Sequence, residues 1–279
     1  MKIGLSSYTY GWGVGISLHK PDKPLSFMEL IERTKEFDLN LLQVCDNLPL
    51  VSLTENEFEQ ASKKLAEYGI EIEIGIGVLN DDEISQHLGI AEKLGARLMR
   101  TLISSSGNIL KEEEILCILR RWVPVFEKRG IKLAIENHDH YSVRILANVI
   151  ETIDSEYCGI CLDTANSLGA GEDIHTVLRH LSKHTINLHL KDIYISRIES
   201  KQGFSVVGAP LGKGILDIPY ITNIIENNGR NANWILEQWA PFNTDIDTTI
   251  KNEKKDAVIG VNYLKDLLAL RSQCMTGQK

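Results

Sequence analysis

The sequence predicts an α/β protein with a single (β/α)8 barrel of the TIM type, and three observations lead to that prediction. Short β-rich runs recur eight times along the 279 residues, and segments with helical spacing of apolar residues lie between them. Successive runs begin roughly 27 to 48 residues apart, and no Pro-, Gly- or Ser-rich linker divides the chain. Strict alternation of strand and helix predicts a parallel sheet, and eight such units predict a closed barrel.

The expected strands are rich in β-branched and other apolar residues. They are residues 2–6, 40–45, 70–76, 97–102, 131–136, 158–163, 185–190 and 233–237. Between them, apolar residues recur every three or four positions, as at Ile115, Leu119 and Val123. Gly69, Gly95 and Gly130 come just before strands, where helices are expected to end in a left-handed cap.

An open, doubly wound sheet is the alternative fold, and it would place a glycine-rich turn after the first strand. The residues there are GWGVG (11–15), which do not have the G-x-G-x-x-G spacing. We therefore expect one barrel domain spanning residues 1–279. Residues 7–24 and 191–216 are longer segments after the first and seventh strands, so they should form loops over the barrel mouth.

Composition and charge exclude several classes of protein. The net charge is −8, whereas proteins that bind phosphate backbones are usually basic, so nucleic acid is not an expected partner. Neither a signal peptide nor an apolar run long enough for a membrane span is visible, so we expect no membrane association and a cytoplasmic location.

Five scattered cysteines predict reduced thiols rather than disulfides: Cys45, Cys117, Cys158, Cys161 and Cys274. Cys158 and Cys161 form a CxxC pair. Residues three apart on a strand point to opposite faces, so we expect neither a redox nor a zinc role for that pair.

Polar residues stand at the ends of four consecutive strands, where a barrel of this type carries its active site. They are Glu136, Asp163, His189 and Glu237. Their apolar neighbours on the same strands occupy the alternate positions, such as Leu133 and Ile135, or Ile186, Leu188 and Leu190, which should face the helices. The four polar side chains should therefore point into the barrel at one level.

Three carboxylates at one mouth would repel each other, and a divalent cation would remove that repulsion. Carboxylate oxygens and an imidazole nitrogen suit Mn, Mg, Co or Zn. The alternative is that Glu136, Asp163, His189 and Glu237 are ordinary polar residues satisfied by loop backbone. His138, two residues beyond Glu136, could point into the same pocket and contact a substrate.

Four motifs resemble the xylose-isomerase-like TIM barrels: IEN (135–137), CLDTAN (161–166), LHLKD (188–192) and ILEQ (235–238). This superfamily includes sugar isomerases and epimerases, inosose dehydratases and endonuclease IV. The segments SSYTYGWGVG (6–15) and DNLPL (46–50) resemble its 3-oxo-isoapionate decarboxylase branch.

The resemblance implies that Glu136, Asp163, His189 and Glu237 hold one divalent metal ion, and that Glu136 and Glu237 also transfer protons. It implies an isomerase or epimerase that acts on a small keto-sugar through a metal-bound enediolate. It also allows a homodimer. The alternative within the superfamily is a lyase, either a decarboxylase of a keto-sugar acid or a dehydratase.

Two departures from the epimerase pattern favour the lyase alternative. Asn166 stands where many ketose epimerases have His, so only hydrogen bonding to a substrate remains there. The Arg expected soon after the ligand His has only a loose equivalent in Arg197, and the HLKD motif places Lys191 on the same face as His189 instead.

Aromatic residues after the first strand are further candidates for substrate contact. Tyr8 and Trp12, together with Tyr10, could form a lid over a sugar. The segment GAPLGKG (208–214) is one residue short of a P-loop, although a phosphorylated substrate stays open.

Two other functional classes compete with a sugar enzyme. An endonuclease of the endonuclease IV type needs further metal ligands on the early strands, but strands two to four end in Cys45, Ile76 and Leu102. A non-catalytic sugar-binding barrel predicts the loss of a ligand, whereas all four are present.

Overall fold

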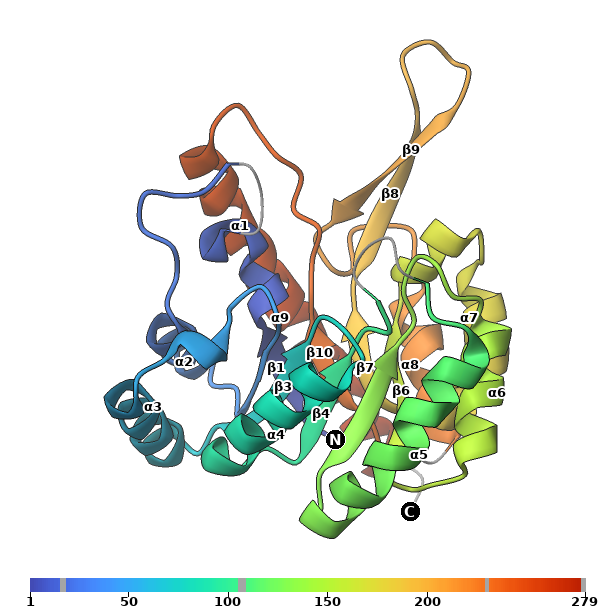
Figure 1. The fold of residues 1–279 in the computed structure, drawn as a ribbon. Coiled ribbons are helices and arrows are strands. Elements are labelled where there is room, and N and C mark those ends of the chain that lie inside the picture. Colours follow the sequence, from blue (N-terminus) through green and yellow to red (C-terminus); the bar gives the residue numbers. More distant parts are fainter. Residues whose placement is uncertain (16–18, 105–108, 229–230, 277–279) are drawn as a thin grey trace.

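The computed structural model describes residues 1–15, 19–104, 109–228 and 231–276, without the side chains of residues 274–276. Eight parallel strands close into a barrel in the order β1-β10-β7-β6-β5-β4-β3-β2, with helices around the outside (Figure 1). They are β1 (Ile3–Ser6), β2 (Leu41–Val44), β3 (Glu71–Ile76), β4 (Leu98–Thr101), β5 (Lys132–Glu136), β6 (Cys158–Asp163), β7 (Thr185–Leu190) and β10 (Asn233–Leu236). The predicted barrel is thus confirmed, with every strand close to its expected position.

The α-helices follow the strands in sequence. They are α1 (Gly11–Val14), α2 (Phe27–Glu36), α3 (Glu55–Tyr68), α4 (Asp81–Leu94), α5 (Glu112–Arg129), α6 (Val143–Ile153), α7 (Ile174–Leu181), α8 (Ile218–Asn227) and α9 (Ile246–Thr276). Short 3-10 helices are η1 (Ser7–Tyr10), η2 (Leu50–Ser52), η3 (Asn166–Ala170) and η4 (Ser182–His184). The expected glycine caps are present, because Gly69, Gly95 and Gly130 end α3, α4 and α5 with φ of 64°, 70° and 64°.

The main core lies between the strands and the surrounding helices. Leu133, Ile135 and Leu162 face outward and are fully buried there, each contributing roughly 1.5–3 kcal/mol through the hydrophobic effect. Cys158 belongs to this outer core, whereas Cys161 lies inside the barrel, so the two cysteines do point to opposite faces as expected.

Ile186 is an exception to the expected alternation on β7. It packs with Leu98, Ala134 and Cys161 in a small apolar cluster instead of joining the outer core. The cause is a register shift, because Ile160 pairs with Thr185 whereas the next residue, Cys161, pairs with Asn187. Ile186 is therefore the extra residue of a bulge, and the prediction that it faces the helices is wrong.

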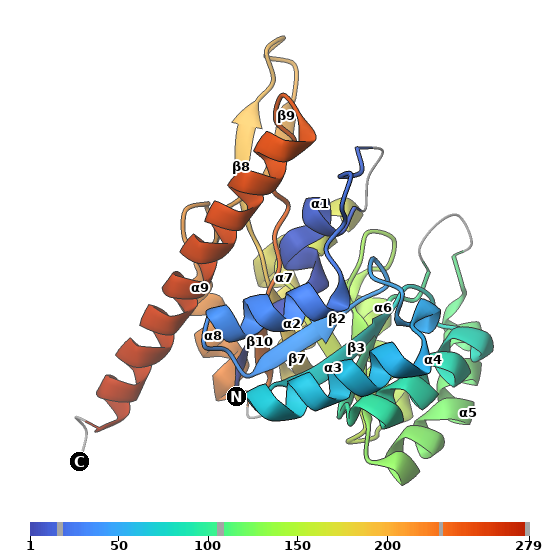
Figure 2. The ribbon, with the colours of Figure 1, turned by 90° about the vertical axis from the view of Figure 1, so that its left-hand side faces the viewer.

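The two segments expected as mouth loops contain regular structure. Residues 7–14 form η1 and α1, and residues 16–18 lie outside the described part. Residues 191–216 contain an antiparallel hairpin of β8 (Asp192–Arg197) and β9 (Phe204–Ala209), which projects away from the barrel (Figures 1 and 2).

Two further findings concern the cysteines and the helices. Cys45, Cys117, Cys158 and Cys161 form no disulfide with one another, and the side chain of Cys274 lies outside the described residues. Within the described ranges, no helix combines the length and apolar character needed to cross a bilayer.

Candidate functional site

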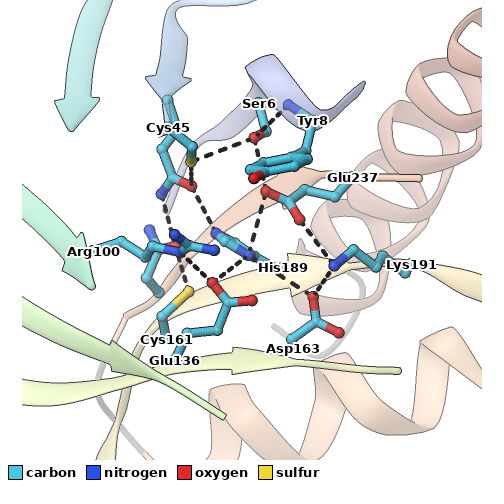
Figure 3. A network of polar contacts seen from close by, with 12 residues as sticks. Ser6, Tyr8, Cys45, Arg100, Glu136, Cys161, Asp163, His189, Lys191 and Glu237 are labelled. Atoms are coloured by element: carbon cyan, nitrogen blue, oxygen red, sulfur yellow. Dashed lines mark hydrogen bonds and ion pairs between the residues drawn. The ribbon is translucent and has the colours of Figure 1, made fainter. Parts of the chain in front are cut away.

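Four polar side chains meet inside the barrel at the carboxyl ends of consecutive strands. Glu136 and Asp163 end β5 and β6, His189 is on β7, and Glu237 follows β10 (Figure 3). Nδ1 of His189 lies 3.4 Å from an oxygen of Glu136 and 3.4 Å from an oxygen of Glu237. It lies 3.8 Å from Oδ2 of Asp163, and all four residues are at most 2% exposed. The alternation of strand residues therefore brings together the four candidates chosen from the sequence.

The orientation of His189 is set by an amide on the far side of the ring. Nε2 of His189 lies 2.7 Å from Oε1 of Gln43. The amide nitrogen of Gln43 donates to Glu73 at 3.0 Å and to Asn187 at 3.2 Å, so its oxygen is the atom that faces His189. Nε2 must then carry a proton and donate it to Gln43, so Nδ1 is the ring nitrogen that faces the carboxylates.

Lys191 brings a positive charge into the same cluster. Its ammonium lies 2.7 Å from Oδ2 of Asp163 and 3.0 Å from Oε2 of Glu237. It also donates to Oδ1 of Asn166 at 3.2 Å and lies 5.2 Å from the ring centre of Trp239. Because Lys191 is only 5% exposed, these carboxylates neutralise a charge that is almost completely desolvated.

Arg100 supplies a second buried cation on the other side of the cluster. Its Nε donates to Oε2 of Glu136, and its Nη1 donates to Asp46 at 3.1 Å. The amide of Asn166 donates to the other oxygen of Glu136 at 2.6 Å. Glu136 is therefore held by donors on both of its oxygens.

Charge interactions within the cluster outweigh burial and shift its pKa values. Burial alone would raise the pKa of Glu136. The charges of Arg100 and His189 have the larger, opposite effect and hold this pKa well below its usual range. Burial also raises the pKa of Glu237, and His189 and Lys191 lower it overall. Burial lowers the pKa of Lys191, but Asp163 and Glu237 raise it above its usual value. Glu136 and Glu237 are thus carboxylates at neutral pH, and Lys191 is an ammonium.

The cluster has the atoms that a divalent cation needs. Nδ1 of His189 is buried without a hydrogen-bond partner, and Oδ2 of Asp163 is contacted by the Lys191 ammonium at 2.7 Å. Ligand atoms of Asp163, His189 and Glu237 all lie within 4.8 Å of one another. Oxygen and imidazole donors in this number fit Mg, Mn, Co or Zn. The residues therefore fit a divalent metal ion.

Three of the residues expected to contact substrate lie at or beside this cluster. Asn166 and Lys191 contact its carboxylates directly. Tyr8 lies close to Glu237 in Figure 3 and donates to Asp46 at 3.0 Å. Burial and the nearby charge of Asp46 raise the pKa of Tyr8, so its hydroxyl stays protonated.

Three others are not brought to the cluster. The indole nitrogen of Trp12 donates to the carbonyl of Ala240. His138 forms its ion pair with the neighbouring Asp139, at 3.6 Å. Arg197 lies on the projecting hairpin, where its guanidinium stacks 4.5 Å from the ring centre of Phe204. The reason in that case is the hairpin itself, which carries residue 197 away from the barrel mouth.

Sequence reasoning missed several residues of the site. Arg100 was overlooked because only the expected strand end, Leu102, was considered, and Arg100 lies two residues before it on β4. Gln43 on β2 was also overlooked. So was Ser6 at the end of β1, whose hydroxyl donates to Glu237 at 2.7 Å. A polar residue within an otherwise largely apolar strand was the available signal for Arg100 and Gln43.

Comparison with known proteins agrees with this architecture. Residues 31–267 match the family model described as xylose isomerase-like TIM barrel. A 3-oxo-isoapionate decarboxylase of Pectobacterium atrosepticum is 32% identical over 264 residues, covering 95% of each chain.

Two solved structures show the same fold. A xylose isomerase-like TIM barrel protein from Mycobacterium smegmatis, in complex with magnesium, has a TM-score of 0.70 and 14% identity, covering 94% of this chain and 97% of its own. A D-psicose 3-epimerase determined with D-fructose has a TM-score of 0.71 and 16% identity, covering 95% and 97%.

Proposed function

The chain belongs to the xylose isomerase-like TIM barrel family, and we propose that within it the protein is a divalent-metal-dependent decarboxylase of a 3-oxo sugar acid. The sequence alone favoured an isomerase or epimerase and kept a lyase as the alternative. The 32% identity to a 3-oxo-isoapionate decarboxylase spans 95% of both chains and supports the lyase. The similarity to a D-psicose 3-epimerase, at 16% sequence identity, supports the fold and not the reaction.

The observation that carries the proposal is the buried ammonium of Lys191 among the four candidate ligands. We propose that Glu136, Asp163, His189 and Glu237 hold Mg, Mn, Co or Zn. A divalent cation bound there would act as a Lewis acid toward the ketone oxygen of the substrate. In a 3-oxo acid, one carbon separates the carboxylate from the ketone. Such an acid loses CO2 most readily when the ketone can accept the electron pair of the bond that breaks.

In the proposed reaction, the bond from the carboxylate carbon to its neighbour breaks and CO2 leaves. The electron pair of that bond moves toward the ketone, and a proton must then return to the carbon that lost CO2. Glu136 and Glu237 are proposed here as ligands of the cation, so they would not supply it. The Nζ of Lys191 carries protons and lies 2.7 Å from Asp163 and 3.0 Å from Glu237, so we assign the proton to it, and solvent then reprotonates it.

The other polar residues keep these groups in position. Arg100 and Asn166 donate to the two oxygens of Glu136, and Ser6 donates to Glu237. Since Asn166 also accepts from Lys191, it couples the position of the ammonium to that of Glu136. Tyr8, at the edge of the cluster, is our candidate for hydrogen bonding to a sugar hydroxyl.

The test uses metal-loaded protein and 3-oxo-isoapionate in D2O, with bicarbonate measured enzymatically and the product examined by proton NMR. We expect one equivalent of CO2, one deuterium at the carbon that lost it, and no reaction in EDTA. Lys191→Gln should slow the reaction by about 10²–10⁴-fold. Lys183→Gln is the control, because that exposed lysine pairs with Glu151 outside the barrel.

Deuterium exchange without loss of carbon would contradict the decarboxylase and support an isomerase or epimerase. A specific feature favours that second candidate. Glu136 and Glu237 each place an oxygen 3.4 Å from Nδ1 of His189, so two carboxylates flank the same point. An epimerase would use one to remove a proton and the other to return it, and Glu237→Gln would then abolish exchange.

A further inference from the structure

The loop that follows the hairpin binds a carboxylate of the chain itself. In the segment GAPLGKG (208–214), the backbone N–H groups of Gly212 and Gly214 donate to Oδ2 of Asp192 at 3.0 and 2.8 Å. A turn of such N–H groups commonly binds anions, phosphate included. Asp192 is 1% exposed, and a Cβ on Gly214 would lie 2.2 Å from its Oδ1, so the loop closes tightly around this side chain. The loop therefore holds the residue after Lys191 in place of a phosphate.

Thr164 holds the backbone of Lys191 itself. β7 ends at Leu190 and the hairpin begins at Asp192, so Lys191 is the junction between them. The hydroxyl of Thr164 accepts the N–H of Lys191 at 2.9 Å and donates to its C=O at 2.7 Å. The two residues are 4% and 5% exposed, so this one oxygen serves two buried backbone groups.

The end of β6 also holds the charge that Lys191 carries. Thr164 directly follows Asp163, whose Oδ2 lies 2.7 Å from Nζ of Lys191. The N–H of Thr164 donates to the C=O of His189 at 3.2 Å, which continues the contact with β7 beyond the last residue of β6. Thr164 and Asp163 thus hold the backbone and the ammonium of Lys191 from one strand end.

The candidate metal ligands beside Thr164 do not depend on its hydroxyl. Oδ1 of Asp163 accepts the backbone N–H groups of Ala165 and Asn166 at 2.8 and 2.9 Å. The contact to His189 comes from the backbone N–H of Thr164, which a side-chain substitution other than proline keeps. Removing the hydroxyl therefore changes the anchor of the ammonium and leaves the contacts of these ligands in place.

Loss of the Thr164 hydroxyl would displace Lys191. A buried N–H and a buried C=O without this partner are costly, so the backbone there would shift to find others. A displacement of about 1 Å can slow a reaction about 10²-fold. We propose that Thr164 is a positioning residue that aligns the Lys191 ammonium for proton transfer, an inference that rests on the decarboxylase proposed above.

The aligned step is the return of a proton after CO2 has left. An N–H bond of the Lys191 ammonium breaks, and a C–H bond forms at the carbon that lost CO2, with the electron pair that the departing CO2 left behind. The lysine amine then takes a proton from solvent.

Steady-state kinetics of the Mn²⁺-loaded, full-length protein with 3-oxo-isoapionate test the proposal. Thr164→Val should lower kcat about 10²-fold, while KM and the calorimetric affinity for Mn²⁺ stay unchanged. Thr164→Ser restores the hydroxyl and should restore kcat. Thr185→Val is the matched control and should behave as the wild type, because Thr185 is a fully buried threonine at the opposite end of β7 whose hydroxyl donates to Leu181 at 2.9 Å.

A spectroscopic measurement gives an answer that does not depend on the reaction. A buried ammonium between two carboxylates exchanges its protons slowly, so its ¹H–¹⁵N NMR signal should be visible in the wild type and absent from Lys191→Gln. We expect Thr164→Val to shift or broaden this signal and Thr164→Ser to leave it in place. If the wild type releases no CO2, the proposed function fails, and the signal still decides whether Thr164 positions the ammonium.

Two results would overturn the role of Thr164. One is a Thr164→Val protein with the kcat and the ammonium signal of the wild type. The other is a kcat that falls together with the affinity for Mn²⁺ and is not restored by serine, which would mean that Thr164 supports the candidate ligands instead.

Discussion

Replacing Gln43 by leucine tests whether the amide that faces His189 prepares Nδ1 for a metal ion. The side chain keeps its approximate size, but Nε2 of His189 loses its acceptor at 2.7 Å. Glu73 keeps donors on both oxygens, from Asn187 at 2.8 Å and Asn233 at 2.9 Å, so no carboxylate is left unpaired. Removing such a partner of a metal-bound histidine typically lowers affinity 10- to 100-fold, or about 1.4–2.8 kcal/mol.

The assay is calorimetric titration of Mn²⁺ into apo protein, together with ¹⁵N NMR of the His189 ring. In the wild type we expect the proton on Nε2, and in Gln43→Leu a mixture of both tautomers. Thr34→Val is the control, because it removes a buried hydrogen bond to Leu30 at 2.8 Å on α2 and should not change metal affinity. An affinity for Mn²⁺ within threefold of the wild type, with Nε2 still protonated, would refute the reasoning.

Three further predictions concern stability. Arg100→Met leaves Glu136 without its buried cation, so urea unfolding should show a loss of about 3–5 kcal/mol, and a loss below about 1 kcal/mol would contradict it. Burial raises the pKa of Glu253 to about 7, against 4.5 in the unfolded chain, so ionising this carboxyl in the folded state costs stability. The cost grows between pH 4.5 and 7 and reaches about 3 kcal/mol. The stability of Glu253→Gln relative to the wild type should therefore rise with pH over that window, and a constant difference would contradict this. Mn²⁺ at 100 times its Kd should add about 2.7 kcal/mol of stability, EDTA should remove it, and a melting temperature insensitive to both would argue against the site.

Much of the fold was predictable because the core imposes strong patterns on the sequence. Burial on one face of each helix and on the outer face of each strand leaves the periodicities that located the eight strands. The glycines before the strands, such as Gly69, marked helix ends because a left-handed cap excludes most other residues. The bulge at Ile186 was not predictable, since one extra residue in a buried apolar strand does not change its composition.

The candidate site was predictable where strand alternation decides the direction of a side chain. Alternation placed Glu136, Asp163, His189 and Glu237 on the inner face, and the structure brings all three carboxylates within 3.8 Å of Nδ1 of His189. It did not locate contacts that depend on loops. Arg197 lies in the same stretch of sequence as Lys191, but the hairpin carries it about 17 Å along an extended strand from its base at Asp192.

The early strands contribute the partners of the site rather than its candidate ligands. Arg100 on β4 and Gln43 on β2 each contact one of those ligands. Each stands one residue before the end of its strand, but two residues before the end expected from the sequence, so a search of the expected strand ends did not find them. An inward polar residue at any level of the barrel is the wider signal, because it must find a buried partner.

The most direct test of the central claim follows the carboxylate carbon itself. A single turnover of 3-oxo-isoapionate, labelled with ¹³C in its carboxylate, is run with the Mn²⁺-loaded protein and analysed by ¹³C NMR. A decarboxylase whose cation is held by Glu136, Asp163, His189 and Glu237 should release the label as CO2 and bicarbonate, and His189→Ala should neither retain metal nor release label. Label that stays in the sugar acid while the protein is loaded with metal would contradict the account.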